Sequence, residues 1–199
     1  RRHDAVPRRN LSRSHRGQRV IYEEERAYTV ETISPYLTSH RVEPIGPVQD
    51  PMNSLPEMTF GSMPNDGGAL LLSRKEFEAL QESEPGSEMF IRRFQGADEL
   101  INGIERYCLW LTSGHWQSYP QIHERVNQVK EAREKSTREA TRRLSSVPHL
   151  FGEIRHIDGL NQIAVPAVSS EGRSYLPAFL IDQKTIISNR CFSLFTSEL

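Results

Sequence analysis

The sequence is poor in cysteine and has no excess of basic charge. Its 199 residues include two cysteines, Cys108 and Cys191, and 25 basic against 26 acidic residues, which gives a formal net charge of −1. Two cysteines without paired spacing or a histidine cluster argue against a disulfide framework and a metal site, so a reducing cytoplasm is the expected setting. Free-standing, non-specific nucleic-acid binders usually carry a marked basic excess, so charge alone does not favour DNA or RNA as a partner.

Long apolar runs are also absent. No segment approaches the roughly 20 apolar residues needed to cross a bilayer, so we expect no membrane partner. The start, Arg1-Arg2-His3-Asp4, has no apolar segment behind it and does not have the pattern of a signal peptide. The chain also lacks an initiating methionine, and we expect it to be a part of something longer.

Compact catalytic motifs are missing as well, and we predict no catalytic or metal-ligating residues in this chain. There is no Gly-rich phosphate loop and no GxSxG, HExxH or CxxC sequence. Ser113-Gly114-His115-Trp116 alone combines a hydroxyl, an imidazole and a large aromatic ring, and a loop packed under Trp116 is the simpler interpretation. Catalytic triads are spatial, so a small-molecule enzyme stays open as a hypothesis; it would need a deep pocket with a strongly shifted titratable group.

Apolar residues make up 36% of the sequence, enough to bury a core. Short apolar segments bounded by turn residues predict strands over 20–22, 69–72, 89–94 and 106–111. The segment Pro64-Asn65-Asp66-Gly67-Gly68 is a strong turn signal, which we interpret as architecture because glycine allows positive φ. Ser73 followed by Glu76 fits a capping box that begins a short helix.

The clearest predicted element is one long amphipathic helix over about 119–145. Its apolar stripe recurs at intervals of three and four residues and comprises Ile122, Val126, Val129, Ala132, Ser136, Ala140 and Leu144. Ser118 with Gln121 is the expected N-terminal cap, and Val147-Pro148 closes the other end. The other faces carry seven basic and four acidic residues, with several pairs spaced four apart. A solvated scaffold helix and a phosphate-facing helix both fit this pattern.

The C-terminal half is predicted to be mainly antiparallel β structure. Segments 150–157 and 162–168 flank Asp158-Gly159, which is a hairpin signal, and 175–181 and 190–196 are further strand candidates. The expected fold class is therefore α+β, with one long helix, short helices and a β-rich C-terminal half.

The first nineteen residues contain seven arginines against one acid, Asp4. A mobile, solvated arm explains this segment. Docking on DNA phosphates is the alternative, because clustered guanidinium groups neutralise backbone charge without reading sequence.

A second polar segment lies between two of the C-terminal strands. Val168-Ser169-Ser170-Glu171-Gly172-Arg173-Ser174-Tyr175 holds hydroxyls, a carboxylate, a guanidinium and a phenol within eight residues. These groups can read base edges: arginine pairs with guanine, glutamate with cytosine, and serine with either. A plain surface loop has the same composition, so both interpretations stay open on these residues alone.

With these residues in view, the chain resembles the target-recognition region of the MmeI-like enzymes, single-chain restriction–modification proteins of type II. The resemblance covers roughly residues 28–195, and its segments follow the order and spacing of the family. They are Ser34-Pro35-Tyr36-Leu37, Gly61-Ser62-Met63-Pro64-Asn65-Asp66-Gly67-Gly68, Phe90-Ile91-Arg92-Arg93-Phe94-Gln95-Gly96-Ala97, Arg106-Tyr107-Cys108-Leu109-Trp110-Leu111, Arg125-Val126 running to Arg133, Pro148-His149-Leu150-Phe151 and Val168-Ser169-Ser170-Glu171-Gly172-Arg173.

The resemblance implies a larger protein that combines an endonuclease, an adenine-specific DNA methyltransferase and a DNA reader. The methyltransferase of such a protein carries an Asn-Pro-Pro-Tyr-type motif and binds S-adenosylmethionine; this chain has no such motif, so no cofactor is expected in it. Residues 28–199 are then a DNA target-recognition domain that lacks its C-terminal end. Residues 1–27 are then the trailing edge of an upstream methyltransferase domain, or the Arg-rich arm.

The expected partners are double-stranded DNA and the upstream methyltransferase domain of the same chain. By resemblance, the base contacts fall on Ser169, Ser170, Glu171, Arg173, Ser188 and Asn189. The phosphate contacts are predicted on the long helix, at Arg125, Arg133 and Arg142. A hypothesis from another class is a non-catalytic protein-interaction or scaffold domain whose helix 119–145 packs on a partner.

Overall fold

The computed structural model describes residues 9–13, 19–23, 26–34, 37–39, 46, 51, 56–170 and 172–196. The chain divides into two compact units, residues 1–50 and residues 51–199. Each unit is described by itself below.

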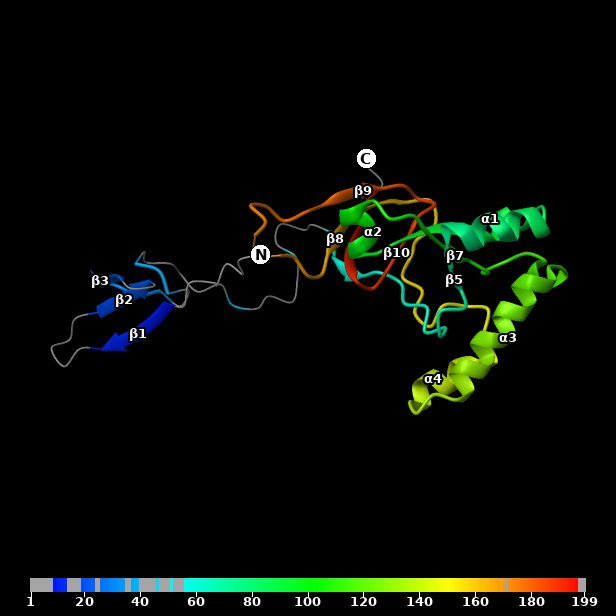
Figure 1. The fold of residues 1–199 in the computed structure, drawn as a ribbon, viewed down its shortest axis with the longest axis horizontal. Helices are drawn as coiled ribbons and strands as arrows, with labels where there is room; N and C mark the ends of the chain where they lie inside the picture. Colours follow the sequence, from blue (N-terminus) through cyan, green and yellow to red (C-terminus); the bar gives the residue numbers. More distant parts are fainter. Residues whose placement is uncertain are drawn as a thin grey trace. The chain divides into compact units, whose positions relative to one another are not determined.

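The N-terminal unit contains a three-stranded antiparallel sheet of β1 (Arg9–Arg13), β2 (Arg19–Glu23) and β3 (Arg26–Val30), in that order (Figure 1). The strand predicted over 20–22 is confirmed as part of β2, and Ile21 on it is buried. Within the Arg-rich segment, residues 9–13 form a paired strand and not a free arm; residues 1–8 and 14–18 lie outside the described residues. The predicted functional boundary after residue 27 falls within β3 and stays a prediction.

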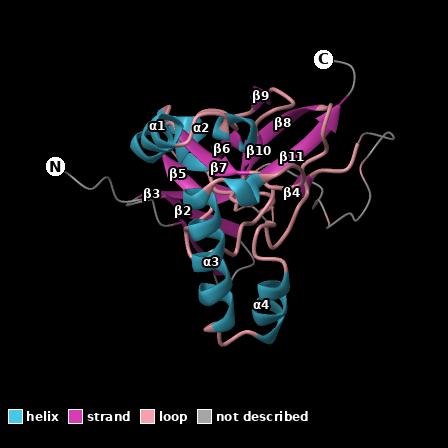
Figure 2. Cartoon of the chain, turned by 90° about the vertical axis from the view of Figure 1, so that its right-hand side faces the viewer, coloured by secondary structure: helices cyan, strands magenta, loops and turns pink. Residues whose placement is uncertain are grey.

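The larger unit is built on two four-stranded sheets (Figures 1 and 2). The first has the order β10 (Ile186–Ile187), β6 (Ile91–Gln95), β7 (Arg106–Leu109) and β5 (Leu71–Ser73), and only its β10–β6 pair is parallel. The second is antiparallel, with the order β4 (Thr59–Phe60), β11 (Cys191–Thr196), β8 (Asn161–Pro166) and β9 (Phe179–Ile181). The expected combination of helices with mostly antiparallel sheets is confirmed.

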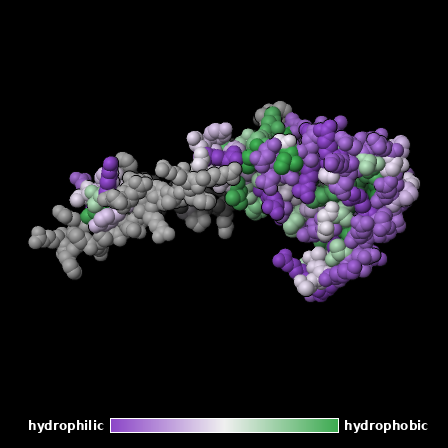
Figure 3. Space-filling model, viewed as in Figure 1, coloured by the Kyte–Doolittle hydropathy of each residue, from purple (hydrophilic) through white to green (hydrophobic). Residues whose placement is uncertain are grey.

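Strands and helices alternate in the first half of this unit, from β5 to α3. The helices are α1 (Arg74–Ser83), α2 (Ala97–Asn102), α3 (Pro120–Glu134) and α4 (Glu139–Arg143), and the 3₁₀ turns are η2 (Ser87–Phe90), η3 (Trp116–Ser118) and η4 (Leu144–Ser146). The main core contains large apolar side chains from β5, β6, β7 and α3, among them Leu72, Phe94, Leu109 and Val126. The visible outer surface of the unit is mostly hydrophilic, with separate apolar patches (Figure 3).

The capping box predicted at Ser73 and Glu76 is confirmed at the start of α1. The Ser73 hydroxyl accepts a hydrogen bond from the Glu76 N–H, and the Glu76 carboxylate accepts one from the Ser73 N–H at 2.8 Å. The Ser73 N–H, and next the Arg125 guanidinium at 2.7 Å, lower the pKa of Glu76 to about 2.

Because its folded-state pKa is depressed, Glu76 stabilises the fold above its ordinary pKa of 4.5, and this contribution is lost as the pH falls toward 2. We expect Glu76→Ala to lower the free energy of unfolding at pH 7 by roughly 1 kcal/mol. The difference in stability between wild type and this variant, measured by thermal unfolding, should shrink steadily as the pH falls from 4.5 to 2. Glu82→Ala, an exposed position on the same helix, is the control. A deficit that is constant with pH would contradict this assignment.

The single helix predicted over 119–145 is not confirmed, because α3 ends at Glu134 and α4 begins at Glu139. Ser136 and Thr137 lie in the break. The Ser136 hydroxyl accepts the Arg138 N–H at 3.2 Å, and the Arg142 guanidinium donates to the Ser136 and Thr137 carbonyls at 2.9 Å. Serine and threonine compete with helical hydrogen bonds in this way, and an arginine satisfies the carbonyls left unpaired at a helix end. The two helices form a hairpin that extends away from the sheets (Figures 1 and 2).

The apolar stripe of the predicted helix is confirmed for the part that lies in α3. Ile122, Val126 and Val129 are buried in the main core, whereas Ala140 on α4 is exposed. The predicted N-terminal cap is wrong: the Ser118 hydroxyl donates to the His115 carbonyl, and the buried Glu84 carboxylate accepts the Gln121 N–H at 2.7 Å.

The predicted C-terminal strands are confirmed at β8, β9 and β11, but the segment 150–157 is not a strand. It makes one isolated bridge, between Glu153 and Met63, and Asp158-Gly159 is a turn that joins it to β8. The partners of β8 are β11 and β9, and both pairings use chain segments that follow it.

The turn at residues 64–68 has the architectural role predicted for it. Asn65, Gly67 and Gly68 have φ values of 47°, 66° and 94°, in the left-handed region that favours glycine and asparagine. The buried Asp66 carboxylate accepts the N–H groups of Gly68 at 3.0 Å and Leu70 at 2.6 Å. This turn therefore leads the chain directly into β5.

Candidate nucleic-acid interface

The polar loop predicted to read bases joins β8 to β9 and is exposed. Ser169, Ser170 and Arg173 are all exposed, and Glu171 lies outside the described residues. The loop has local order: the Arg173 N–H donates to the Ser170 carbonyl at 3.1 Å, and the Gly172 N–H donates to the Ser170 hydroxyl at 3.3 Å. In Figure 1 the loop is the orange segment between β8 and β9. The side chains of Ser169, Ser170 and Arg173 are therefore accessible to a large partner.

The second predicted base-contacting segment, Ser188-Asn189, is a β-turn between β10 and β11. The Cys191 N–H donates to the Ser188 carbonyl at 2.9 Å and closes the turn. Ser188 is 5% exposed, and its hydroxyl accepts the Arg190 N–H at 3.2 Å. Asn189 is half-buried, and its side-chain amide contacts the Met63 sulfur at 3.2 Å. Ser188 therefore has a structural role in this fold, and Asn189 retains a partly accessible side chain.

The loop and the turn leave the second sheet at the same end. Cys191 at the start of β11 is paired with Pro166 at the end of β8. Beyond this pair, the Ala167 N–H donates to the Arg190 carbonyl at 2.9 Å, so the root of the loop lies against the turn. We call this end of the sheet, residues 167–178 with 188–190, the loop end.

The segment Gly61-Ser62 holds the loop end in place. The Ser62 N–H donates to the Ile187 carbonyl at 2.7 Å, and the Asn189 N–H donates to the Ser62 carbonyl at 3.0 Å. A Cβ atom added at Gly61 would lie 2.4 Å from the Ile187 carbonyl oxygen and 2.5 Å from that of Ser188. This close approach of two backbones requires glycine at position 61.

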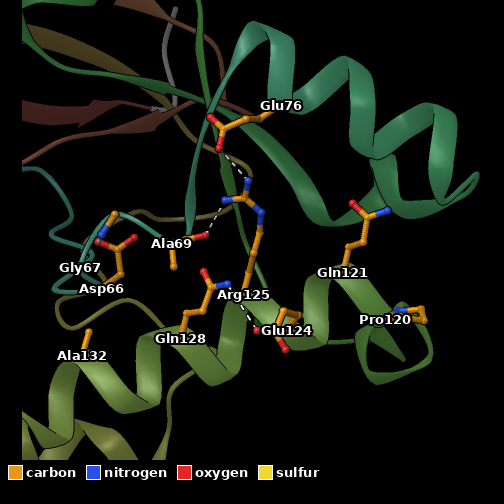
Figure 4. A pocket seen from close by; sticks show the side chains of 11 residues that line it. Asp66, Gly67, Ala69, Glu76, Pro120, Gln121, Glu124, Arg125, Gln128 and Ala132 are labelled. Atoms are coloured by element: carbon orange, nitrogen blue, oxygen red, sulfur yellow. Dashed lines mark hydrogen bonds and ion pairs between the residues drawn. The ribbon is translucent and has the colours of Figure 1, made fainter.

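The first of the predicted phosphate contacts, Arg125, lies in a hollow of about 630 Å³ between α1 and α3 (Figure 4). Its guanidinium donates to the Glu76 carboxylate at 2.7 Å and to the Ala69 carbonyl at 3.0 Å. Glu76, Glu124 and Asp66 also line the hollow. Three carboxylates around one guanidinium make this hollow unfavourable for a phosphate.

The second predicted phosphate contact, Arg133, is 1% exposed and makes five hydrogen bonds to backbone carbonyls. An arginine has five N–H donors, so all of them are used. The acceptors come from three chain segments at 2.7–3.0 Å and are the carbonyls of Pro64, Asn65, Leu144, Val147 and Leu150. Burial lowers the pKa of Arg133, and the nearby Asp66 carboxylate raises it. Since no N–H group remains for a phosphate, Arg133 is corrected from a DNA contact to a structural residue.

The third predicted phosphate contact, Arg142, is exposed on α4, and its guanidinium also donates to the two carbonyls in the break between α3 and α4. Arg138 in the break is exposed, and its side chain has no ion pair among the described residues. The far end of the hairpin therefore presents two arginines to the solvent that have no carboxylate partner among the described residues.

Segment 152–158 is anchored to β6 through Arg92. The Arg92 guanidinium donates to the Asp158 carboxylate at 2.7 Å and lies 5.7 Å from the centre of the Trp110 ring. The Arg92 hydrogen bond is the main cause of the lowered pKa of Asp158. Burial, and then Arg92, lower the pKa of His156, which keeps its imidazole neutral at pH 7. These groups hold the fold together and leave Arg92 little freedom to contact a partner.

Ser113-Gly114-His115-Trp116 has the structural role that the sequence favoured. Trp116 is buried and its ring stacks on His149 at 5.4 Å, whereas Ser113 and His115 are exposed. Both cysteines are free and buried; burial raises the pKa of Cys191 to about 11 and that of Cys108 further. Over the described ranges, no three histidine, cysteine or acidic side chains are grouped to hold a metal ion, and no helix is long and apolar enough to cross a membrane.

Arg190 was not among the predicted contacts, although it lies in the turn beside the predicted Ser188-Asn189. The register of β8 and β11 brings Arg190 to the root of the loop, a contact that the sequence alone does not indicate.

These features define a mixed α/β domain that presents an exposed polar loop and a rigid turn at one end of an antiparallel sheet. Residues 41–199 match the family described as MmeI, target recognition domain. This chain belongs to that family.

Two known proteins are similar to most of the chain. "DNA methyltransferase A" of Bacillus subtilis (strain 168) is 36% identical over 184 residues, which are 91% of this chain and 21% of that protein. The structure of the type IIL restriction-modification enzyme MmeI in complex with DNA superposes with a TM-score of 0.80 at 32% identity, over 91% of this chain and 25% of that chain. The chain thus spans about a fifth to a quarter of the length of these relatives.

Proposed function

We propose that this chain recognises a specific sequence in double-stranded DNA for a restriction–modification enzyme. The observation that carries the proposal is the TM-score of 0.80 over 91% of the chain with an enzyme solved in complex with DNA. The exposed polar loop end supports it from the chemistry of the side chains, since hydroxyl, amide and guanidinium groups recognise base edges.

In this proposal the loop enters the major groove and discriminates bases. Arg173 donates to a guanine, Glu171 accepts from a cytosine, and Ser169 and Ser170 contact either. Asn189 borders the same surface and suits an adenine. Each good bidentate contact contributes about 1–3 kcal/mol of discrimination against the wrong base. Ser188 is left out of the reading set because its hydroxyl is buried in the turn.

Phosphate affinity is proposed to be shared with another part of the protein. The net charge of −1 and the acidic surroundings of Arg125 give this chain little affinity for a polyanion by itself. Arg142 on the α3–α4 hairpin is the phosphate contact that we retain, because it is exposed and has no carboxylate partner among the described residues.

The reaction itself is proposed to take place elsewhere in the longer protein. An upstream domain would bind S-adenosylmethionine and methylate an adenine, and residues 1–27 would be its trailing edge; a further domain would cleave DNA. A base must leave the stack to be methylated, so the reader would also hold the duplex while the adenine is extruded. Two free, buried cysteines fit a reducing, cytoplasmic compartment.

The scaffold hypothesis depended on a long helix with an apolar face for a partner protein. The apolar residues of α3 are buried in the core of their own domain, so this helix offers no such face.

Selection of bound duplexes from a randomised DNA library, with the complete protein, tests the proposed function. We expect a single short sequence to be enriched. Enrichment of no sequence, with equal affinity for all duplexes, would overturn the proposal.

A further inference from the structure

We propose that Arg190 binds a DNA phosphate at the rim of the groove that the 167–178 loop enters. This inference rests on the proposed function, and it adds a contact that neither the motifs nor the comparisons assign.

Arg190 occupies a rigid position. It lies in the centre of the turn closed by the Cys191 N–H and the Ser188 carbonyl. Its own N–H donates to the Ser188 hydroxyl at 3.2 Å, and its carbonyl accepts the Ala167 N–H at 2.9 Å. The preceding residue, Asn189, is bonded to Ser62 through its N–H. The backbone of Arg190 is therefore fixed on every side, and its side chain is the only free part.

Among the described residues, no carboxylate neutralises the guanidinium of Arg190, and the residue is exposed. Arg190 shares this state with Arg138, Arg142 and Arg173, whereas the other arginines of the larger unit have partners: Arg74, Arg92, Arg93, Arg106, Arg125, Arg143 and Arg155 form ion pairs, and Arg133 is saturated by carbonyls. An unpaired guanidinium on a fixed backbone, beside an exposed polar loop, is suited to an anionic partner, because no carboxylate has to be displaced before the anion binds.

The position of Arg190 within the loop end favours a phosphate over a base as its ligand. Ser170 and Arg173 lie toward the middle of the 167–178 loop, whereas Arg190 lies at its root, against Ala167. A loop that inserts its middle into a groove brings its root to the rim, and phosphates line the rim. Arg190 would then fix the depth and register of the loop without reading the sequence.

The test compares Arg190→Ala with wild type in the complete protein, on the selected duplex and on a random duplex, over a series of salt concentrations. We expect affinity for both duplexes to fall by the same factor, roughly tenfold. The slope of log affinity against log salt should become shallower by about one. Arg190→Lys should retain most of the affinity, because an ammonium also binds phosphate as a point charge.

Lys184→Ala is the matched control. Lys184 is an exposed cation without an ion pair among the described residues, and it follows β9 at the opposite end of the same sheet. Its removal subtracts the same charge and should leave the salt slope unchanged. The thermal midpoints of both alanine variants should equal that of wild type, since neither side chain has a partner in the part of the chain that the structure describes.

Three results would overturn the assignment. If Arg190→Ala changes the ratio of the two affinities, Arg190 contacts a base. If it changes neither the affinities nor the salt slope, Arg190 does not touch DNA. If Lys184→Ala has an equal effect, the loss of affinity comes from general charge and not from a contact of Arg190. Failure of the proposed function is a separate outcome, because wild type would then fail to distinguish the two duplexes. The salt slope on random duplex would still report on Arg190.

Discussion

Arg133→Met is expected to lower the free energy of unfolding by about 3–5 kcal/mol, near the upper end of single-residue effects. The five carbonyls that Arg133 binds belong to the turn before β5, the η4 region and the segment after it. Methionine matches the volume of the stem but donates no hydrogen bond, so these carbonyls would lose their partner in a place that water does not reach. Chemical unfolding monitored by Trp116 and Trp110 fluorescence measures the loss.

Two further variants identify the cause of this loss. Arg133→Lys keeps the charge but has three donors on a flexible stem, and it should recover less than half of the stability. Arg138→Met changes an exposed arginine of the same hairpin that has no ion pair among the described residues, and it should cost less than about 0.5 kcal/mol. A wild-type stability for Arg133→Met would contradict the five-carbonyl arrangement.

Gly61→Ala is expected to have the second largest effect. It should lower the free energy of unfolding by at least about 3 kcal/mol and abolish the ability to select a DNA sequence. The added methyl group would lie 2.4 Å from the Ile187 carbonyl oxygen and 2.5 Å from the Ser188 carbonyl oxygen. Both are backbone atoms that cannot rotate away. The two segments must separate, which breaks the bonds from Ser62 to Ile187 and from Asn189 to Ser62. The turn that supports the loop end would then lose its anchor.

Gly172→Ala is the control for this substitution. The nearest atom to an added Cβ at position 172 is the Ser170 hydroxyl at 3.7 Å, an ordinary contact, so the fold should be unaffected. Differential scanning calorimetry compares the two variants. Equal thermal midpoints for Gly61→Ala and wild type would show that the backbones are not in close approach.

The local elements of this fold could be predicted from the sequence because their causes are local. Ser73 and Glu76 are three residues apart and cap α1 by contacts with each other. Ile122, Val126 and Val129 follow the helical period and are buried. The composition of the 168–175 segment indicated an exposed polar loop, and the described residues of this segment are exposed.

What the sequence could not reveal depends on contacts between distant segments. A periodicity argument places an arginine on the solvent face, yet Arg133 is buried because Pro64 and Leu150 supply carbonyls 69 and 17 residues away. Ser188 was a candidate base contact by resemblance to the family, and it is buried at the end of β10, which pairs with β6. Arg190 reaches the loop only through the register of β11 with β8. Long-range pairing decided each of these outcomes.

The most direct measurement of the central claim compares the affinity of the complete protein for its selected duplex with that for a random duplex, before and after Arg173→Ala. If this surface reads bases, the substitution should reduce the ratio of the two affinities by about 10- to 100-fold and leave binding to random DNA nearly unchanged. An equal loss on both duplexes would reduce Arg173 to a phosphate contact, and an unchanged ratio would mean that the loop end does not discriminate between DNA sequences.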